Sequence, residues 1–332
     1  MPRAVASQKL GVALDDGRSI FLDVVDKLIA SRMVVTATSG GGKSYLLRKI
    51  LELAYGVMPQ IVFDPEGEFY TLRDKYQHLL VGRPGGRAGD IPATIQSAPT
   101  LARRLIETGA SAVIDLSEMD ERDQQIYVRD FVTALLALPR DLWRPALVVF
   151  DEAQIFVPEK GDGESVSAAA VRRLMTRGRK RGFATILASQ RLTSIDKTAV
   201  AQAKNYLIGQ SDLDIDSKRA GATLGMTAAA AREALRNLEP GEFFGFGPAI
   251  SRTIVRLRVA PVETRHPEPG KVLAPLPSSA AMKELIAKFA VIPQEAEAEL
   301  DEVKGLHAKN QAQADRWEIV SILGGQLRVY LH

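Results

Sequence analysis

Apolar positions along the chain fall into two patterns, short continuous runs and longer runs with helical spacing. The short runs predict strands at 33–37, 60–64, 111–117, 146–154, 183–191 and 205–210. Helical spacing appears at 45–54, 100–108, 121–138 and 165–180. Strands that alternate with helices predict an α/β fold, with a central, mostly parallel sheet flanked by helices.

The two ends of the chain show different patterns. Residues 10–22 predict a small hairpin around the Asp-Gly pair at 16–17, and two further strands beyond residue 242 predict a β-extension of the sheet. Prolines at 261–279 indicate a linker. Helical patterns then occupy 280–290 and 294–314. We therefore expect a domain at 1–260, a proline-rich linker at 261–279 and a short helical C-terminal extension at 280–332.

Composition narrows the class of protein. Of 332 residues, 46% are hydrophobic and 25% are charged, which is ordinary for a soluble globular chain. Apolar runs such as 146–150 are too short to span a bilayer, and the N-terminus lacks the pattern of a secretion signal. The absence of cysteine excludes disulfides and fits a cytoplasmic location without membrane attachment. Because the net charge is only +3, any nucleic-acid surface must come from local clustering.

A glycine-rich segment, "ATSGGGKS" at 37–44, lies between a predicted strand and a predicted helix. It follows the P-loop pattern of phosphate-binding proteins, except that Ala37 replaces the first glycine. Backbone N–H groups of such a loop surround phosphate oxygens, a lysine reaches the β- and γ-phosphates, and a serine binds Mg²⁺. We therefore expect ATP and Mg²⁺ as cofactors, with nucleotide contacts from Ser39, Gly40, Gly41, Gly42, Lys43, Ser44 and Tyr45.

A second motif, "ALVVFDE", ends a predicted buried strand with two acids. We expect Asp151 to hold Mg²⁺ together with Ser44, and Glu152 to polarise the attacking water. This pair favours ATP hydrolysis over transfer to a bound acceptor, because water needs a base. Gln190, at the end of the next strand, is placed to contact the γ-phosphate or the water. The long separation in sequence between the two motifs leaves room for a strand and a helix between them. In the simplest nucleotide kinases, by contrast, the strands that carry the two motifs are neighbours.

Four motifs in order, "TSGGGKS", "FDPEGEFYTLR", "VVFDEAQ" and "RGRKRGFATILASQR", resemble the HerA/FtsK group of DNA-pumping ATPases, the HerA branch in particular. The resemblance covers roughly residues 10–260. It implies a RecA-like P-loop fold, a homo-hexameric ring and ATP-driven movement of double-stranded DNA, independent of its sequence. It makes Lys43, Glu152 and Gln190 catalytic.

HerA proteins carry an N-terminal β-barrel, for which the 36 residues before Ala37 are too few. This puts in doubt the nuclease or other effector protein that usually docks on that barrel.

The basic segment "RRLMTRGRKRG" at 172–182 contains six cationic residues and no acid. In the HerA/FtsK group an arginine before the sensor strand acts on the ATP of the neighbouring subunit. The resemblance makes Arg179 the first candidate for this catalytic role, followed by Arg177 and Arg173. The alternative is a solvated helix end, where cations are favoured.

Several alternatives remain open at the sequence level. The chain could instead be a P-loop kinase of another substrate, or an ATP-dependent assembly module without translocation. DNA contacts are expected from Lys197, Lys204 and the 172–181 cluster. Asp64, Glu66 and Glu68 match a motif of the family, but the sequence gives them no role, and Pro65 and Gly67 are equally consistent with a turn.

Overall fold

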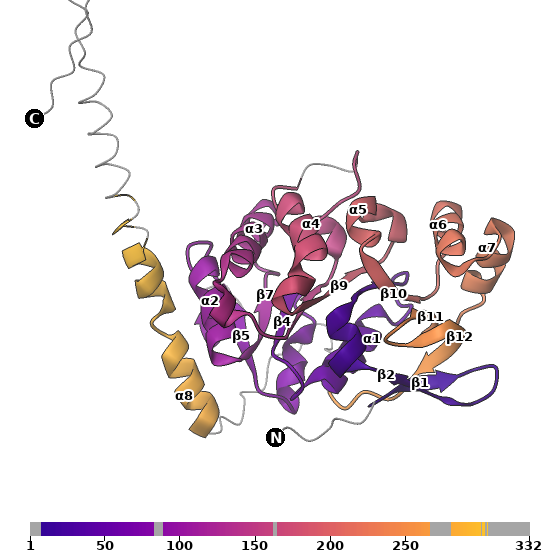
Figure 1. Ribbon diagram of the computed structural model, residues 1–332, viewed down its shortest axis with the longest axis horizontal. Helices are drawn as coiled ribbons and strands as arrows, with labels where there is room; N and C mark the ends of the chain where they lie inside the picture. Colours follow the sequence, from indigo (N-terminus) through magenta and orange to yellow (C-terminus); the bar gives the residue numbers. More distant parts are fainter. Residues whose placement is uncertain are drawn as a thin grey trace, which may run out of the picture.

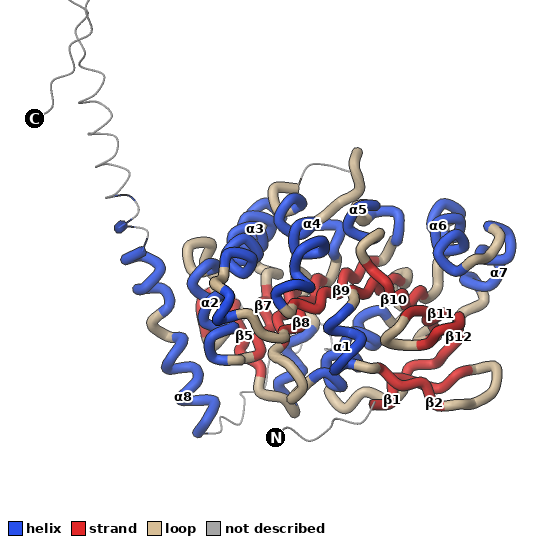
Figure 2. Tube along the Cα trace, viewed as in Figure 1, coloured by secondary structure: helices blue, strands red, loops and turns tan. Residues whose placement is uncertain are grey.

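The computed structural model describes residues 8–82, 89–161, 165–265 and 280–299, together with 301, 302 and 304. Twelve strands of the described residues form one sheet, in the order β2-β1-β12-β11-β10-β3-β9-β8-β4-β7-β5-β6 (Figures 1 and 2). The strands are β1 (Gln8–Ala13), β2 (Ser19–Leu22), β3 (Arg32–Thr36), β4 (Gln60–Asp64), β5 (His78–Gly82), β6 (Ile91–Pro92), β7 (Ser111–Asp115), β8 (Ala146–Phe150), β9 (Phe183–Ser189), β10 (Ala203–Ile208), β11 (Glu242–Gly247) and β12 (Ser251–Val259).

The sheet has a parallel part and an antiparallel part. All neighbours from β10 to β6 pair in parallel, whereas β11, β12, β1 and β2 pair antiparallel. The predicted α/β fold with a mostly parallel central sheet is therefore confirmed. The two strands beyond residue 242 extend that sheet at β10, and the hairpin of β1 and β2 completes this end.

Helices cover both faces of the parallel part. One apolar core joins α2, α3 and α4 to one face of the sheet, and a second core packs α1 against the other face. Every residue of β3, β4, β7, β8 and β9 is buried, as expected for strands covered on both sides. The α-helices are α1 (Lys43–Ala54), α2 (Ala98–Thr108), α3 (Glu121–Ala137), α4 (Ala168–Arg177), α5 (Lys197–Val200), α6 (Asp214–Leu224), α7 (Ala228–Arg236) and α8 (Ala280–Phe289).

Several predicted elements are shorter in the structure, including the strands expected at 111–117 and 183–191, which end at Asp115 and Ser189. The strand expected at 146–154 ends at Phe150, because Asp151 and Glu152 leave the sheet in a turn. The helix expected at 165–180 is α4, followed by a 3₁₀ turn at Gly178–Arg181. Conversely, β5 and the helical pair of α6 and α7 occupy segments for which the sequence pattern gave no element.

The first residues of the predicted linker are packed against α1. Lys49 donates to the carbonyl of Pro261, and the buried carboxylate of Glu52 accepts the N–H groups of Glu263 and Thr264 at 2.8 to 2.9 Å. Arg265 in turn pairs with Asp74. Residues 261–265 therefore form a strap across the P-loop helix. The remainder of the predicted linker, 266–279, lies outside the described residues.

The described part of the C-terminal extension is helical and docks on α2. Met282 and Phe289 of α8 and Ile292 of the following helical segment join the core below α2. Glu295 accepts from Arg104 of α2 at 2.6 Å. Most residues beyond 299, including much of the predicted helix at 294–314, lie outside the described residues. None of the described helices is long and apolar enough to cross a membrane.

Candidate nucleotide-binding site

The glycine loop connects β3 to α1 at the carboxyl edge of the parallel strands. Gly42 lies directly before α1 with φ of 93°, and a Cβ there would come within 2.7 Å of the backbone nitrogen of Gly241. Gly40 also has a positive φ, of 76°. The loop therefore requires glycine at both positions, for backbone conformation and, at Gly42, also for space.

Ala37 occupies the position where the P-loop pattern has glycine. It is buried and its φ is not positive, so a side chain is tolerated there. The space comes from Gly209, which follows the neighbouring strand β10: a Cβ on Gly209 would lie 2.8 Å from the Cβ of Ala37. The missing glycine is thus compensated by one on the adjacent chain segment.

A cavity of about 250 Å³ opens above the loop. Among the residues expected to contact nucleotide or to act on it, those lining the cavity are Ser39, Gly40, Gly42, Lys43, Ser44, Tyr45, Glu152 and Gln190. Thr38 and Glu68 line it as well, although the sequence did not single them out as site residues. Gly41 and Asp151 do not line it. The N–H of Gly41 donates to the carbonyl of Thr38, and its own carbonyl accepts from Gly241.

The lysine of the loop bridges the two acids that follow β8. Lys43 Nζ donates to Asp151 Oδ1 and lies 2.8 Å from Glu152 Oε1. All three side chains are at most 7% exposed. The motif strands are not neighbours, since β9 lies between β3 and β8. Because β9 follows both motifs in the sequence, it is not one of the elements for which their spacing left room. Folding therefore brings the two motifs together across an intervening strand.

The charges of this group shift one another's pKa values. Burial raises the pKa of Asp151 to about 6, although Lys43 opposes the shift; the charges of Glu152 and Glu68 add to it. Burial disfavours the charged forms of Lys43 and Glu152 too. It is outweighed at Lys43 by the charges of Asp151 and Glu152, and at Glu152 by the charge of Lys43 and by hydrogen bonds from Gln154, Lys43 and Gln190. The pKa of Lys43 is therefore raised and that of Glu152 lowered.

Both the side chain and the backbone of Glu152 are fixed by their surroundings. Its Oε1 accepts from Gln190 at 3.2 Å and its Oε2 accepts from Gln154 at 2.6 Å. Its backbone has φ of 43°, and among the described residues no other non-glycine residue has a positive φ. Such strain is maintained where the surroundings fix a side chain in a required position. The structure thus aims Glu152 into the cavity beside Gln190.

The segment after β4 places another acid in the cavity. Asp64 ends β4, is fully buried, and accepts the N–H groups of Glu68 at 3.0 Å and Phe69 at 2.8 Å. Burial and the nearby charge of Asp115 raise the pKa of Asp64 to about 7. Asp64 therefore holds the backbone of the segment after β4, whereas the side chain of Glu68 lines the cavity. Glu66 is exposed and does not line the cavity.

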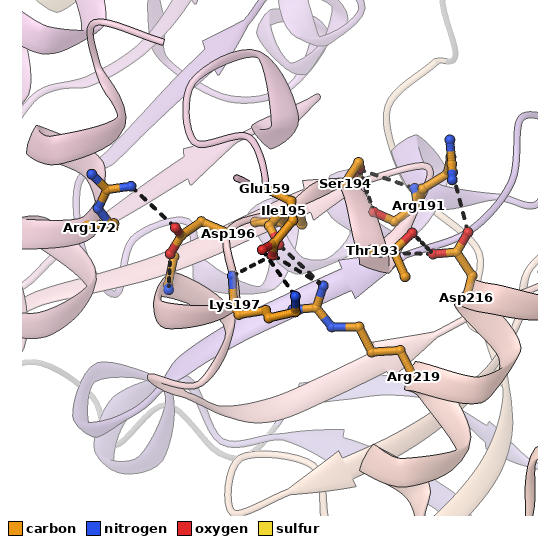
Figure 3. A network of polar contacts seen from close by, with 12 residues as sticks. Glu159, Arg172, Arg191, Thr193, Ser194, Ile195, Asp196, Lys197, Asp216 and Arg219 are labelled. Atoms are coloured by element: carbon orange, nitrogen blue, oxygen red, sulfur yellow. Dashed lines mark hydrogen bonds and ion pairs between the residues drawn. The ribbon is translucent and has the colours of Figure 1, made fainter. Parts of the chain in front are cut away.

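A polar network links the segment after β9 to α6 (Figure 3). Arg191, the residue after Gln190, lies 3.4 Å from Asp216 of α6, which also accepts from the backbone and hydroxyl of Thr193 at 2.8 Å. Asp216 is 3% exposed. This network anchors the chain immediately beyond Gln190, and nothing in the sequence pattern indicated it because its partners come from separate elements.

Arg179 lies away from the cavity of its own chain. It belongs to the 3₁₀ turn that precedes β9, at the amino edge of the parallel strands, whereas the cavity is at their carboxyl edge. Its side chain is exposed, as are those of Arg177 and Arg173, and within the described residues no carboxylate pairs with any of the three. Arg179 therefore cannot act on the nucleotide of its own subunit in this arrangement.

Two predicted DNA contacts have different surroundings. Lys197 is largely exposed, but it pairs with Glu159 at 3.2 Å, and the carboxylate of Glu159 also accepts from its backbone (Figure 3). Lys204 is exposed on β10. Within the 172–181 cluster, Arg172 pairs with Asp196 at 3.2 Å. Part of the predicted cationic surface is thus neutralised by the protein itself.

Comparison with known proteins agrees with this geometry. The family model described as the central domain of the helicase HerA matches residues 9–86, which contain the P-loop and the segment after β4. The chain is similar to the HerA/FtsK group of P-loop ATPases. No curated protein matches the sequence.

Two solved structures of other proteins share the fold. VirB4 of Thermoanaerobacter pseudethanolicus is 15% identical, with 77% of this chain and 97% of that chain covered and a TM-score of 0.58. The bacterial conjugative coupling protein TrwB is 12% identical, with 82% and 94% covered and a TM-score of 0.55. The chain therefore shares its fold with these two proteins.

Proposed function

We propose that this chain is the subunit of a homo-hexameric ring that hydrolyses ATP to move double-stranded DNA in the cytoplasm. The observation that carries the ATPase part is the buried group of Lys43, Asp151 and Glu152, with Gln190 on Glu152. A site with a phosphate-binding lysine, two acids and a polar contact on the second acid contains the parts that hydrolysis requires.

In this proposal, the loop N–H groups and Lys43 bind the triphosphate. Lys43 exchanges its contacts with Asp151 and Glu152 for phosphate oxygens, so that ATP binding frees both carboxylates. Glu152 then polarises the attacking water, and Gln190 orients the same water or contacts the γ-phosphate. Because Glu152 activates water, the γ-phosphoryl group passes to water and not to another acceptor.

Mg²⁺ fits the residues present. Asp151 Oδ2 is buried and, among the described residues, has no hydrogen-bond partner, while Ser44 lines the cavity beside Lys43. Ser44 and Asp151 would hold the ion, directly or through water. When bound, Mg²⁺ neutralises charge on the β- and γ-phosphates. A buried unpaired carboxylate oxygen is costly unless a cation or donor meets it, and this supports the assignment.

The DNA part rests on similarity and on charge. The helicase HerA model matches the P-loop region, and a conjugative coupling protein shares the fold. The exposed cations Arg173, Arg177, Arg179 and Lys180 have no carboxylate partner among the described residues. In a ring, Arg179 would face the cavity of the neighbouring subunit, where an arginine stabilises the charge that develops during hydrolysis.

One experiment separates this function from its alternatives. ATP turnover is measured at increasing concentrations of duplex DNA, and the native mass is determined with and without ATP. We expect stimulation by DNA and a mass six times that of the chain. Turnover that needs a different acceptor would indicate a kinase, and nucleotide binding without turnover would indicate an assembly module.

A further inference from the structure

We propose that Glu68 is a third protein group of the Mg²⁺–ATP site, holding the coordination shell of the ion together with Ser44 and Asp151. The inference rests on the proposed function, because it concerns the same nucleotide. It assigns a role to an acid whose motif the sequence left unexplained.

The backbone of Glu68 is fixed from two sides by buried charged residues. Its N–H donates to Asp64 Oδ1 at 3.0 Å, and its carbonyl accepts from Arg48 Nη2 at 2.7 Å. Asp64 and Arg48 are both 0% exposed. Arg48 is itself anchored, since its Nη1 donates to Thr264 of the strap at 3.2 Å. Burying two ionisable side chains that both hold this loop residue indicates that its position matters.

This anchoring places Glu68 next to the predicted metal ligand of α1. Ser44 and Arg48 are four residues apart on the same helix, so their side chains lie on one face. Because Arg48 holds the carbonyl of Glu68, the glutamate lies over the face that also carries Ser44. Both Glu68 and Ser44 line the cavity. The ion predicted at Ser44 would therefore lie within reach of the Glu68 carboxylate.

Glu68 is half-buried, and one of its carboxylate oxygens is left without a hydrogen bond. Its Oε2 is buried and has no hydrogen-bond partner among the described residues, a property it shares with Asp151 Oδ2. The charge of Arg48 attracts Glu68, but its Nη1 and Nη2 donate to Thr264 and to the Glu68 carbonyl. Lys43 contacts Asp151 Oδ1 and Glu152. The unpaired oxygen of Glu68 belongs to a residue that lines the cavity, and the unpaired oxygen of Asp151 is buried beside Lys43, which also lines it. A cation that enters with the nucleotide would account for both.

Mg²⁺ suits this arrangement better than a metal bound by protein alone. The described residues contain no group of three His, Cys, Asp or Glu side chains that could hold a metal ion. Mg²⁺ in phosphate sites is bound by one or two carboxylates together with substrate phosphates and water. The site would therefore bind the ion tightly only when ATP is present.

The test is the Mg²⁺ dependence of nucleotide affinity, measured with a fluorescent, non-hydrolysable ATP analogue. Glu68→Gln removes the charge and keeps the size, and Glu66→Gln is the matched control from the same loop, exposed and outside the cavity. For Glu68→Gln, we expect the Mg²⁺ concentration at half-maximal tightening to rise at least about 10-fold, the scale seen for partners of metal ligands. Affinity in EDTA should be unchanged or tighter, because a negative charge near the phosphates has gone.

Each other outcome has a definite meaning. If Glu68→Gln keeps the Mg²⁺ dependence of the wild type and of Glu66→Gln, Glu68 is not part of the metal site, even if turnover falls. If the wild type binds the analogue without any effect of Mg²⁺, the proposed function itself fails. Glu68→Asp is the second variant should Glu68→Gln not fold: it keeps the charge but shortens the reach, and an unchanged Mg²⁺ dependence in Glu68→Asp would equally contradict the proposal.

Discussion

Lys43 Nζ lies 2.8 Å from Glu152 Oε1, so the lysine of the P-loop directly contacts the acid that we assign as the base for water. The same lysine contacts Asp151. ATP binding must therefore break an ion pair before hydrolysis can begin, and the strength of that pair sets part of the nucleotide affinity.

Glu152→Gln should retain ATP binding and lower turnover by at least about 10²-fold, the range for a lost general base. The neutral amide also weakens the hold on Lys43, so the affinity for ATP should stay equal or increase. Rapid-quench turnover and equilibrium binding of labelled ATP measure the two effects, with Glu66→Gln as the unaffected control. A variant that lost affinity but kept its rate would show that Glu152 is a metal ligand or a structural residue.

Arg179→Ala should bind ATP normally in each subunit yet lower hydrolysis by about 10³-fold, in the range reported for arginine fingers. Lys43→Ala should also abolish hydrolysis, because the phosphate clamp is lost. Mixed rings of the two variants should recover part of the activity, since some interfaces combine an intact Lys43 with an intact Arg179.

The exposed neighbour Lys180 supplies the control for this experiment. Lys180→Ala rings should hydrolyse ATP at close to the wild-type rate. If rings shown by mass to contain both Arg179→Ala and Lys43→Ala subunits stay inactive, Arg179 does not act across the interface.

Protonation of His78 should lower the free energy of unfolding at acidic pH. Burial lowers its pKa to about 4, while in the unfolded chain it titrates near 6.5, and its Nε2 lies 2.9 Å from Gln60 Oε1. Between these values the unfolded state binds more protons, so the free energy of unfolding falls as pH drops from 6.5 to 4, by roughly 3 kcal/mol in full. Denaturant unfolding at several pH values should show a shallower acid loss for His78→Gln than for the wild type. Parallel profiles for the two proteins would contradict the assignment.

DNA binding should be insensitive to sequence and sensitive to salt, because a motor must hold the phosphate backbone at every position. If each of six subunits makes one phosphate contact, log K against log salt should slope by roughly −5 for duplex DNA. Fluorescence anisotropy with duplexes of unrelated sequence measures this. Lys204→Ala should reduce the slope, whereas Lys197→Ala should change it less, because Lys197 already pairs with Glu159. A slope near zero would exclude backbone binding.

Local patterns were sufficient to predict the P-loop, the acids after β8 and the alternation of strands and helices. They depend on neighbours in sequence: apolar runs define buried strands, and glycines define the loop before α1. The acids of the segment after β4 were visible as a motif, but their roles depend on which atoms they meet. Asp64 holds backbone and Glu68 faces the cavity, a difference that no spacing reveals.

Contacts between distant segments account for what the sequence did not predict. Residues 261–265 looked like a linker because of their composition, yet Glu52 binds two of their N–H groups more than two hundred residues away in sequence. The pair of α6 and α7 is rich in alanine and has few large apolar residues at helical spacing, so its pattern was weak. Its attachment to the sensor strand runs through Asp216 and could only be seen in the fold.

ATP-driven movement along duplex DNA is the central claim, and displacement of a third strand from a triplex tests it most directly. We expect the wild type to release a triplex-forming oligonucleotide from a long duplex in the presence of ATP and Mg²⁺, and Glu152→Gln to bind the same duplex without releasing it. Hydrolysis that proceeds equally with and without DNA, with no release of the third strand, would contradict the account.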